Sequence, residues 1–392
     1  MKKVIDAYVS RIVSQGLAAE DDVAMIGLDA EFTSNRPMAD ISPELCKVFD
    51  HMNITTLLYA EPAEPYRSIL ASLTAFGKGR LVPTDCETRT FLHDIPLLPG
   101  LSAETVSRAL SDRKAAIIDG KGIISRGTVT PEQAFVSFSS VCFSTFVKFF
   151  TDVMFQREDT ACPRNEKNMV PLDAYRDISL RIPPGHPGSG TIPAFPPASV
   201  DEVYEHLIVT GRELVRQGLV DSYFGNISYV YGDTMYISQT GSSLDRLETC
   251  IDAVPLDGSS SSGITASSEL SAHIGIFRKT GLRAIVHGHP KFIVIMSMSC
   301  RRPGCDLSTC YRSCREERFV AGIPVVSGEI GTGPTGLVRT VPGAMGKKGA
   351  VIVFGHGIFS ASRDSFGPAF RLIQEVEEDC RREYFNKIQA LI

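Results

Sequence analysis

The sequence repeats itself across a segment rich in proline and glycine, and this internal similarity constrains the fold more than any other feature. Residues 183–197 contain PPGHPGSG and three further prolines, which cannot sustain a helix or a central strand and therefore predict a linker. Short patterns recur in the same order on both sides, beginning with VSQGL at 13–17 and VRQGL at 215–219. We therefore expect two tandem domains that share one fold.

Two longer matches place strand-like segments at equivalent points of the two halves. NITTLLYAEP at 53–62 lies over GLRAIVHGHP at 281–290, and AAIIDGKGIIS at 115–125 lies over AVIVFGHGIFS at 350–360. Each segment contains a short apolar run, which is typical of a buried strand. The two halves are therefore expected to build their sheets from corresponding strands.

The two halves differ in the residues that could carry chemistry. Aligned positions hold three imidazoles in the second half and a phenol, a carboxylate and an ammonium in the first: His287, His289 and His356 against Tyr59, Glu61 and Lys121. One carboxylate beside an ammonium cannot hold a transition metal as three neutral imidazoles do. We interpret residues 1–155 as a degenerate, metal-free domain, residues 156–199 as the linker, and residues 200–392 as the catalytic domain.

The histidines of the second half stand where strands end. His287 and His289 follow an apolar run and are two residues apart, so both rings can lie on one face, and Pro290 then stops the strand. His356 lies between two glycines after a second apolar run. Three imidazoles leave a position open on zinc, as in catalytic sites. The pattern predicts a site for Zn²⁺ or another divalent transition metal.

The composition argues against several function classes. The net charge of −5, with no basic run interleaved with aromatics, argues against nucleic-acid binding. No segment reaches the roughly 18 uninterrupted apolar residues of a membrane span, and the uncharged stretch 133–147 is better interpreted as a buried helix. Asp6 and Arg11 interrupt the apolar residues that a signal peptide needs. With no export signal, the ten cysteines are expected as thiols or metal ligands in the cytoplasm.

Five short motifs carry a resemblance to a known family: Gly225-Asn226-Ile227-Ser228, Thr240-Gly241-Ser242, Ser267-Ser268-Glu269, His287-x-His289-Pro290 and Gly355-His356-Gly357. In this order they resemble the class II aldolase/adducin family, in its zinc-dependent sugar-phosphate aldolase branch, which includes fuculose-phosphate aldolase. The resemblance is strong over 200–385 and weak over 5–155. It implies an α/β fold with two tandem α/β/α sandwich domains, each around a mostly antiparallel central sheet.

The resemblance also assigns roles outside the histidine cluster. The glutamate that matches Glu269 is the family's general acid/base, and small polar positions hold the substrate phosphate: Asn226, Thr240, Gly241, Ser267 and Ser268. Turns rich in hydroxyl and backbone N–H groups support the second role, because they bind anions. A structural interpretation stays open, since serines often cap helices and asparagine and glycine are common in turns. His186 and His273 are interpreted as structural.

Four cysteines fall within a short segment after the first histidine motif: Cys300, Cys305, Cys310 and Cys314. This density indicates a possible second metal, as structural zinc or an iron–sulfur site, although the spacing lacks the CxxC pairs of zinc ribbons. Reduced thiols on a loop are the alternative. Tyr311 is the only tyrosine between the two histidine motifs, where the resembling family has its catalytic tyrosine.

These patterns together predict a class II, zinc-dependent aldehyde-lyase. An open Lewis acid can hold the carbonyl and hydroxyl oxygens of a phosphorylated ketose and stabilise the charge left when a carbon–carbon bond breaks or forms. The expected products are dihydroxyacetone phosphate, or a similar fragment, and an aldehyde. A sugar-phosphate epimerase or dehydratase of the same superfamily is the first alternative. A non-catalytic scaffold like adducin is the second, and the three retained histidines argue against it.

The first half carries a phenylalanine-rich apolar stretch at 135–150, where the second half carries the charged stretch 375–382. Such a helix needs partner surfaces on several sides. We expect the degenerate domain to replace a neighbouring subunit, so that a homodimer imitates the tetramer usual in the resembling family. A homotetramer is the alternative.

A last expectation concerns the cation of the metal-free half. Ser42-Pro43-Glu44 aligns with Ser267-Ser268-Glu269, which would bring Glu44 near Lys121 and Glu61. The Lys121 ammonium would then stand in for the missing metal ion.

Overall fold

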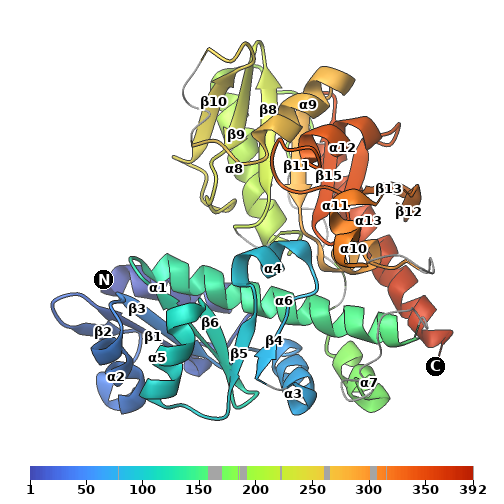
Figure 1. The fold of residues 1–392 in the computed structure, drawn as a ribbon. Helices are drawn as coiled ribbons and strands as arrows, with labels where there is room; N and C mark the ends of the chain where they lie inside the picture. Colours follow the sequence, from blue (N-terminus) through green and yellow to red (C-terminus); the bar gives the residue numbers. More distant parts are fainter. Residues whose placement is uncertain are drawn as a thin grey trace. The chain divides into compact units, whose positions relative to one another are not determined.

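The computed structural model describes residues 1–77, 79–157, 170–183, 185, 192–220, 223–259, 265–300, 307–314 and 316–391. These residues form two compact units, one mainly Met1–Gln156 and the other mainly Gly185–Ile392 (Figure 1). Each unit is built around a β-sheet of its own.

The first unit contains α1 (Lys2–Ser14), β1 (Val23–Leu28), β2 (Phe32–Ser34), α2 (Pro43–His51), β3 (Thr56–Ala60), α3 (Tyr66–Phe76), β4 (Arg80–Leu81), α4 (Cys86–Leu92), β5 (Ile95–Leu98), α5 (Ala103–Asp112), β6 (Ala115–Ile118), β7 (Gly122–Gly127), α6 (Pro131–Arg157) and α7 (Leu172–Leu180). Its strands lie in the order β2-β1-β3-β7-β6-β5-β4. Neighbouring strands are antiparallel, except that β5 and β6 are parallel.

The second unit contains α8 (Val200–Arg216), β8 (Asn226–Tyr231), β9 (Thr234–Ser238), β10 (Ile251–Pro255), α9 (Leu270–Thr280), β11 (Ala284–Gly288), α10 (Lys291–Ser297), α11 (Leu307–Ser313), β12 (Arg318–Val320), β13 (Ile323–Val326), α12 (Leu337–Ala344), β14 (Ala350–Val353), β15 (Gly357–Ser362) and α13 (Phe366–Gln389). Its strands lie in the order β10-β9-β8-β11-β15-β14-β13-β12. Only β13 and β14 are parallel among the described pairs.

The two sheets share one strand order. When β10 is set aside, each strand of the first sheet has a counterpart at the same place in the second, and the parallel pair falls at the same position. The register agrees as well, because Tyr59 lies opposite Ile124 as His287 lies opposite Phe359. The structure therefore pairs the strands of the two units in the alignment expected from the sequence.

Helices cover both faces of the sheet in the second unit. Apolar residues of α9 and α12 form one core with strand residues such as Val230, Ile285 and Val353. Tyr229 points to the opposite face of the pleat and contacts Phe366 at the start of α13, with ring centroids 5.8 Å apart. The sheet thus lies between α9 and α12 on one face and α13 on the other.

The first unit has the same layers. Apolar residues of α2 and α5 form a core with strand residues that include Ile26, Leu57 and Ile124. Ser125 points to the opposite face and donates its hydroxyl to the carbonyl oxygen of Ala134 in α6, at 2.7 Å. α6 therefore covers the face that α13 covers in the second unit.

α6 is long and apolar enough, by length and composition, to cross a membrane. However, 89% of its apolar window is buried, and a core helix meets the same criteria. Phe146 and Phe150 are buried within it with ring centroids 4.7 Å apart. The burial favours a core helix, as expected from the sequence.

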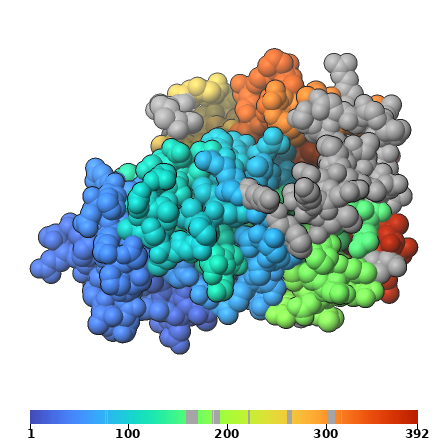
Figure 2. All heavy atoms as spheres, turned by 60° about the horizontal axis from the view of Figure 1, so that its bottom comes forward, coloured from blue at the N-terminus to red at the C-terminus, as the bar shows by residue number. Residues whose placement is uncertain are grey.

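One helix lies within the segment that the sequence analysis assigned to the linker. α7 packs next to α3, and the ring of its Tyr175 lies 6.5 Å from that of Phe150. α7 lies at the surface in Figure 2, in light green, and its Leu180 is exposed. The prolines and glycines that predicted a linker begin only after this helix, at Pro183.

Candidate metal centre

Two antiparallel strands of the second unit bring the three histidines to one point. His287 lies within β11, His289 lies just beyond its last residue, and His356 immediately precedes β15. β11 and β15 pair so that Gly288 lies opposite Ile358. Because the chain is extended at β11, the imidazoles at 287 and 289 lie on the same face.

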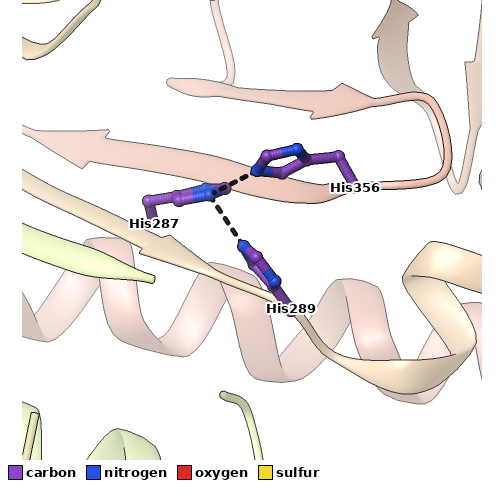
Figure 3. Close-up of side chains that lie close together, drawn as sticks. All are labelled: His287, His289 and His356. Atoms are coloured by element: carbon purple, nitrogen blue, oxygen red, sulfur yellow. Dashed lines mark hydrogen bonds between the residues drawn. The ribbon is translucent and has the colours of Figure 1, made fainter. Parts of the chain in front are cut away.

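The Nε2 atoms of the three histidines converge. His287 Nε2 lies 3.1 Å from His356 Nε2 and 2.9 Å from His289 Nε2 (Figure 3). Zinc–nitrogen bonds of about 2.0–2.1 Å at a tetrahedral angle place two ligand atoms roughly 3.3 Å apart, which is close to these distances. All three side chains are buried. The spacing therefore suits ligands of a single metal ion.

His287 is held in one tautomer. Its Nδ1 lies 3.0 Å from the carbonyl oxygen of Ile358, so Nδ1 carries the proton and Nε2 presents a lone pair. The ring stacks on Phe359 with centroids 4.0 Å apart. Burial lowers the pKa of His287 to about 3 and that of His356 to about 4, and lowers the pKa of His289 well below its usual value. All three imidazoles are thus neutral at pH 7, which is the form that binds metal.

Glycines allow the backbone to bring these rings together. A Cβ atom at Gly357 would lie 2.3 Å from the carbonyl oxygen of Gly288 and 2.7 Å from Cδ2 of His289. A Cβ atom at Gly288 would lie 2.8 Å from the carbonyl oxygen of Leu219. Glycine at 357 therefore lets the ends of β11 and β15 approach each other, and glycine at 288 lets the turn at Leu219 approach β11.

Glu269 is the carboxylate beside the histidines. It lies at the N-terminus of α9 with 4% of its surface exposed, and its Oε2 is 3.2 Å from His287 Nε2. Its Oε1 is 3.5 Å from His356 Nε2 and accepts no hydrogen bond from the described residues. Burial raises the pKa of Glu269, while the electrostatic interaction with the nearby His356 ring and the hydrogen bond from Asn226 oppose the rise.

A chain of three buried residues continues behind Glu269. Asn226 Nδ2 donates to Glu269 Oε2 at 2.7 Å, Asn226 Oδ1 lies 2.5 Å from His273 Nε2, and His273 Nδ1 lies 2.7 Å from the hydroxyl of Ser228. The sequence analysis interpreted His273 as structural and gave Ser228 no role. The signal it missed is that His273 follows Glu269 by one helical turn, so both side chains lie on one face of α9.

The other residues that the resemblance assigns to phosphate binding lie in two neighbouring segments: Thr240, Gly241, Ser267 and Ser268. Backbone hydrogen bonds join the segments, from Thr240 N to Thr265 O at 2.9 Å and from Ser267 N to Ser238 O at 3.1 Å. Thr240, Gly241 and Ser268 are exposed. Asn226 differs from them, because both ends of its amide are occupied inside the site.

Glu377 supports the chain that leaves the histidine motif. It lies on α13, far from the motif in sequence, and accepts the N–H groups of Phe292 at 3.0 Å and Ile293 at 2.8 Å. These N–H groups are in the first turn of α10, which begins directly after Pro290. Glu377 therefore caps the helix that follows His289. The sequence gave no signal for this contact.

The donor set fits a divalent transition metal ion such as zinc. Three neutral imidazole nitrogens and one carboxylate are the ligands that such ions accept, and three imidazoles alone leave a position open. The lone pairs of these groups meet in a buried place where only a cation or shared protons can offset their repulsion. Oε1 of Glu269 is buried and accepts no hydrogen bond from the described residues, so it is available to a cation or to a proton.

The predicted second metal site stays a prediction, because Cys305 lies outside the described residues. Of the other three thiols, Cys310 is buried, Cys300 and Cys314 are partly buried, and none of the three is in a disulfide. The hydroxyl of Tyr311 accepts hydrogen bonds from the Arg312 guanidinium at 2.6 and 2.8 Å.

The ion pairs of the first unit differ from those expected. The Lys121 ammonium lies 3.1 Å from the carboxylate of Asp119, and both side chains are largely exposed. The carboxylate of Glu44 pairs instead with Lys47 at 2.7 Å and accepts the N–H of Ala103 at 2.8 Å. An exposed lysine with this partner does not replace a buried metal ion, so that hypothesis was wrong.

Comparisons with known proteins match the part of the chain that contains the three histidines. A family model described as the class II aldolase and adducin N-terminal domain matches residues 205–384. A curated protein of Nocardia farcinica, a probable bifunctional methylthioribose-1-phosphate isomerase/methylthioribulose-1-phosphate dehydratase, is 30% identical over 115 residues. The match covers 28% of this chain but only 19% of that protein.

Solved structures give similar matches. L-fuculose-1-phosphate aldolase from Thermus thermophilus is 25% identical and covers 48% of this chain and 96% of its own, with a TM-score of 0.39. A sugar-phosphate aldolase from Thermotoga maritima is 19% identical and covers 47% of this chain and 96% of its own, with a TM-score of 0.34. The family-model match, on the segment that carries the histidine site, shows that residues 205–384 belong to the class II aldolase and adducin family.

Proposed function

We propose that residues 200–392 form a metal-dependent lyase that acts on a small phosphorylated ketose, with Zn²⁺ or another divalent transition metal as cofactor. The observation that carries this proposal is the convergence of His287, His289 and His356 beside the buried carboxylate of Glu269. Three imidazoles with one position left for substrate are typical of catalytic sites, whereas structural zinc sites are closed by four protein ligands.

When bound, the metal ion would act as a Lewis acid that polarises the oxygen atoms of the substrate. Glu269 would move the proton. Its Oε2 is occupied by the Asn226 amide, whereas its Oε1 accepts no hydrogen bond from the described residues. Oε1 is therefore the atom positioned to take a substrate proton and return it. Burial raises the pKa of this carboxyl, and a bound cation would lower it.

The phosphate group would be held at the exposed segments next to Glu269. Thr240, Gly241 and Ser268 offer hydroxyl and backbone N–H groups there, and Gly241 has a φ of +67°, the left-handed conformation of a turn. Because Asn226 already uses both ends of its amide, we expect it to serve Glu269 rather than the phosphate.

The aldolase reaction fits these groups. Oε1 of Glu269 would accept the proton of a substrate hydroxyl as the adjacent carbon–carbon bond breaks, and the bond's electrons would pass to the carbon next to the ketone. A proton added at that carbon completes dihydroxyacetone phosphate, or a similar fragment, and the oxygen that lost its proton becomes the aldehyde.

A dehydratase is the second candidate, because the curated relative is named partly as a methylthioribulose-1-phosphate dehydratase. In that reaction the carboxylate takes a proton from the carbon next to the ketone, and the hydroxyl on the following carbon leaves with a proton as water. One buried carboxylate serves either reaction. An epimerase of the same superfamily remains the third.

The test is the metal content of the purified chain together with product analysis on a panel of phosphorylated ketoses. An aldehyde together with dihydroxyacetone phosphate supports the aldolase, and a dehydrated ketone supports the dehydratase. His287→Ala should remove both metal and turnover. Wild-type protein without metal, or unchanged turnover in His287→Ala, would refute the proposal.

The proposal extends to the whole chain in three respects. We propose that the matching strand orders of the two units reflect a tandem duplication in which residues 1–155 lost the metal site. We propose that the chain assembles as a homo-oligomer, a dimer imitating a tetramer or a tetramer, which native mass measurement would test. We also propose a cytoplasmic location, in keeping with described cysteines that form no disulfide.

A further inference from the structure

The hydrogen bonds behind Glu269 run in one direction. Asn226 presents its Nδ2 to the carboxylate, so its Oδ1 faces His273. A carbonyl oxygen can only accept, and therefore His273 Nε2 must carry the ring proton. His273 Nδ1 is then a bare acceptor and receives the hydroxyl proton of Ser228. Burial lowers the pKa of His273 to about 3, which keeps the ring neutral.

Every member of this chain is withdrawn from water. Ser228 and His273 are 0% exposed, Asn226 is 6% exposed and Glu269 is 4% exposed. The edge of the His273 ring also packs against Phe359, with centroids 5.8 Å apart, and Phe359 stacks on the metal ligand His287. A buried polar chain of this kind is rigid when fully paired and destabilising when one member is lost.

The strands of the first unit show what replaces two members. Asn226 lies opposite His287 in the sheet, and Ala24 lies opposite Tyr59, the residue that corresponds to His287. Ala24 therefore corresponds to Asn226, and two residues later Ile26 corresponds to Ser228. Both replacements are apolar.

The helices show what replaces the other two. When the alignment of β3 with β11 is extended toward the N-terminus without a gap, the buried Leu45 of α2 corresponds to the buried His273 of α9. Ile41 then falls on Glu269, so the alignment of Glu44 with Glu269 made from sequence is three residues out of register. The four counterparts, Ala24, Ile26, Ile41 and Leu45, belong to one apolar core.

The same strand order thus forms with four polar residues at these positions in the second unit and four apolar residues in the first. The fold therefore does not need these polar residues. Their hydrogen bonds lead to the carboxylate of Glu269, which gives a reason for their presence. We propose that Ser228, His273 and Asn226 are positioning residues that hold Glu269 with Oε2 blocked and Oε1 free for the substrate. This inference rests on the proposed function of Glu269 as the proton carrier.

The first experiment separates positioning from a merely structural role. His273→Leu introduces the residue found in the first unit and breaks the chain, whereas His273→Gln keeps both a donor and an acceptor. We expect His273→Leu to lower kcat on the order of 10-fold to 100-fold, with KM and metal content changed less than about threefold. His273→Gln should recover much of the loss. Ile276→Val, a buried change on the same helix, is the matched control and should keep full turnover.

A second readout does not depend on turnover. In metal-free protein labelled with ¹⁵N-histidine, the His273 signals, identified by their loss in His273→Leu, should show the proton on Nε2 and a hydrogen-bonded Nδ1. Ser228→Ala should shift the Nδ1 signal toward that of a free acceptor. The proton on Nδ1, or a His273→Leu protein with wild-type kcat, would overturn the inference. If wild-type protein turned over no substrate, the proposed function would fail. The tautomer measurement would still decide whether Ser228, His273 and Asn226 are hydrogen-bonded in this order.

Discussion

The end of β11 in the second unit and the end of β3 in the first have the same backbone and opposite chemistry. In the second unit, His287 and its neighbours bury neutral imidazoles, a carboxylate and the polar chain behind it. In the first, Ala24, Ile26, Ile41 and Leu45 fill the matching interior with apolar side chains, and Lys121, the counterpart of His356, forms an exposed pair with Asp119. Strand order and register are therefore specified without the groups to which we assign the chemistry.

A pair of equivalent glycines sharpens this comparison. A Cβ atom at Gly357 would meet the backbone of Gly288 and the ring of His289, whereas one at Gly122 would meet the ring of Tyr59 at 2.3 Å. Both units need a small residue where β7 or β15 begins, because each packs a ring across it. Both units therefore require the close approach, and they differ in the ring that lies there.

The largest effect is expected from the ligand itself. His287→Ala should remove the bound metal and lower turnover at least about a thousandfold, since about 4 kcal/mol of transition-state stabilisation would be lost. Tyr59→Phe is the matched control at the equivalent strand position and should change neither quantity. Metal analysis and turnover of both variants measure the contrast. Equal losses in the two variants would mean that the first unit takes part in the site.

Exchanging the interiors should have unequal effects on stability. Leu45→His places an imidazole in an apolar core where Ala24 and Ile26 offer no partner, and we expect a loss of about 2–4 kcal/mol in the free energy of unfolding. The reverse exchange, Asn226→Ala, Ser228→Ile, Glu269→Ile and His273→Leu together, replaces all partners at once and should cost less than about 1.5 kcal/mol.

Urea unfolding of the two proteins, each against the wild type, gives this comparison. The fourfold variant should unfold cooperatively and lack turnover. If it unfolded more readily than Leu45→His, the polar chain would be needed for the fold, and the contrast between the units would have another cause.

A smaller effect should distinguish the helices that cover the two sheets. Glu377 of α13 corresponds to the buried Cys142 of α6 when the helices are aligned at their first residues. Burial raises the pKa of Glu377 to about 7, against the hydrogen bonds from Phe292 and Ile293 that favour the charged form. The folded state therefore binds this proton more tightly than the unfolded state, and stability should fall as pH rises between about 4.5 and 7.

The fall should reach up to about 3 kcal/mol, because one pKa unit corresponds to about 1.36 kcal/mol. Urea unfolding across this pH range should give a flatter profile for Glu377→Gln than for the wild type. Glu375→Gln, an exposed change two residues away, should keep the wild-type slope. Parallel profiles for Glu377→Gln and the wild type would show that this carboxyl does not titrate in that window.

The strands and the convergence of the three histidines could be predicted from sequence, because both leave local signals. Apolar runs that end in Pro62 and Pro290 mark the same strand twice, and two histidines spaced by one residue on an extended chain necessarily share a face. The positions of the three histidines could therefore be inferred from short local patterns and from the similarity between the two halves of the sequence.

The supporting contacts could not be predicted, because they join residues distant in sequence. Glu377 reaches the start of α10 from the far end of the chain, and the pairing of Asn226 with His273 depends on how α9 packs on β8. A short similarity also misled the alignment: Ser-Pro-Glu at Glu44 resembles Ser-Ser-Glu, yet the buried positions of the two helices place Ile41 opposite Glu269. The alignment of α2 with α9 therefore follows from their buried positions, whereas the short sequence similarity gave the wrong register.

The smallest effect is expected where the first unit keeps a charge at a ligand position. Lys121 corresponds to His356 but is largely exposed, and its partner Asp119 is exposed as well. Exposed pairs of this kind contribute little, so Lys121→Met should change the free energy of unfolding by less than about 0.5 kcal/mol, independent of pH, and leave metal content unchanged. Urea unfolding at several pH values checks this. A large, pH-dependent loss would restore a structural role for the ammonium. A negligible one would mean that the first unit has no lysine in place of a metal ion and is stabilised there by apolar packing.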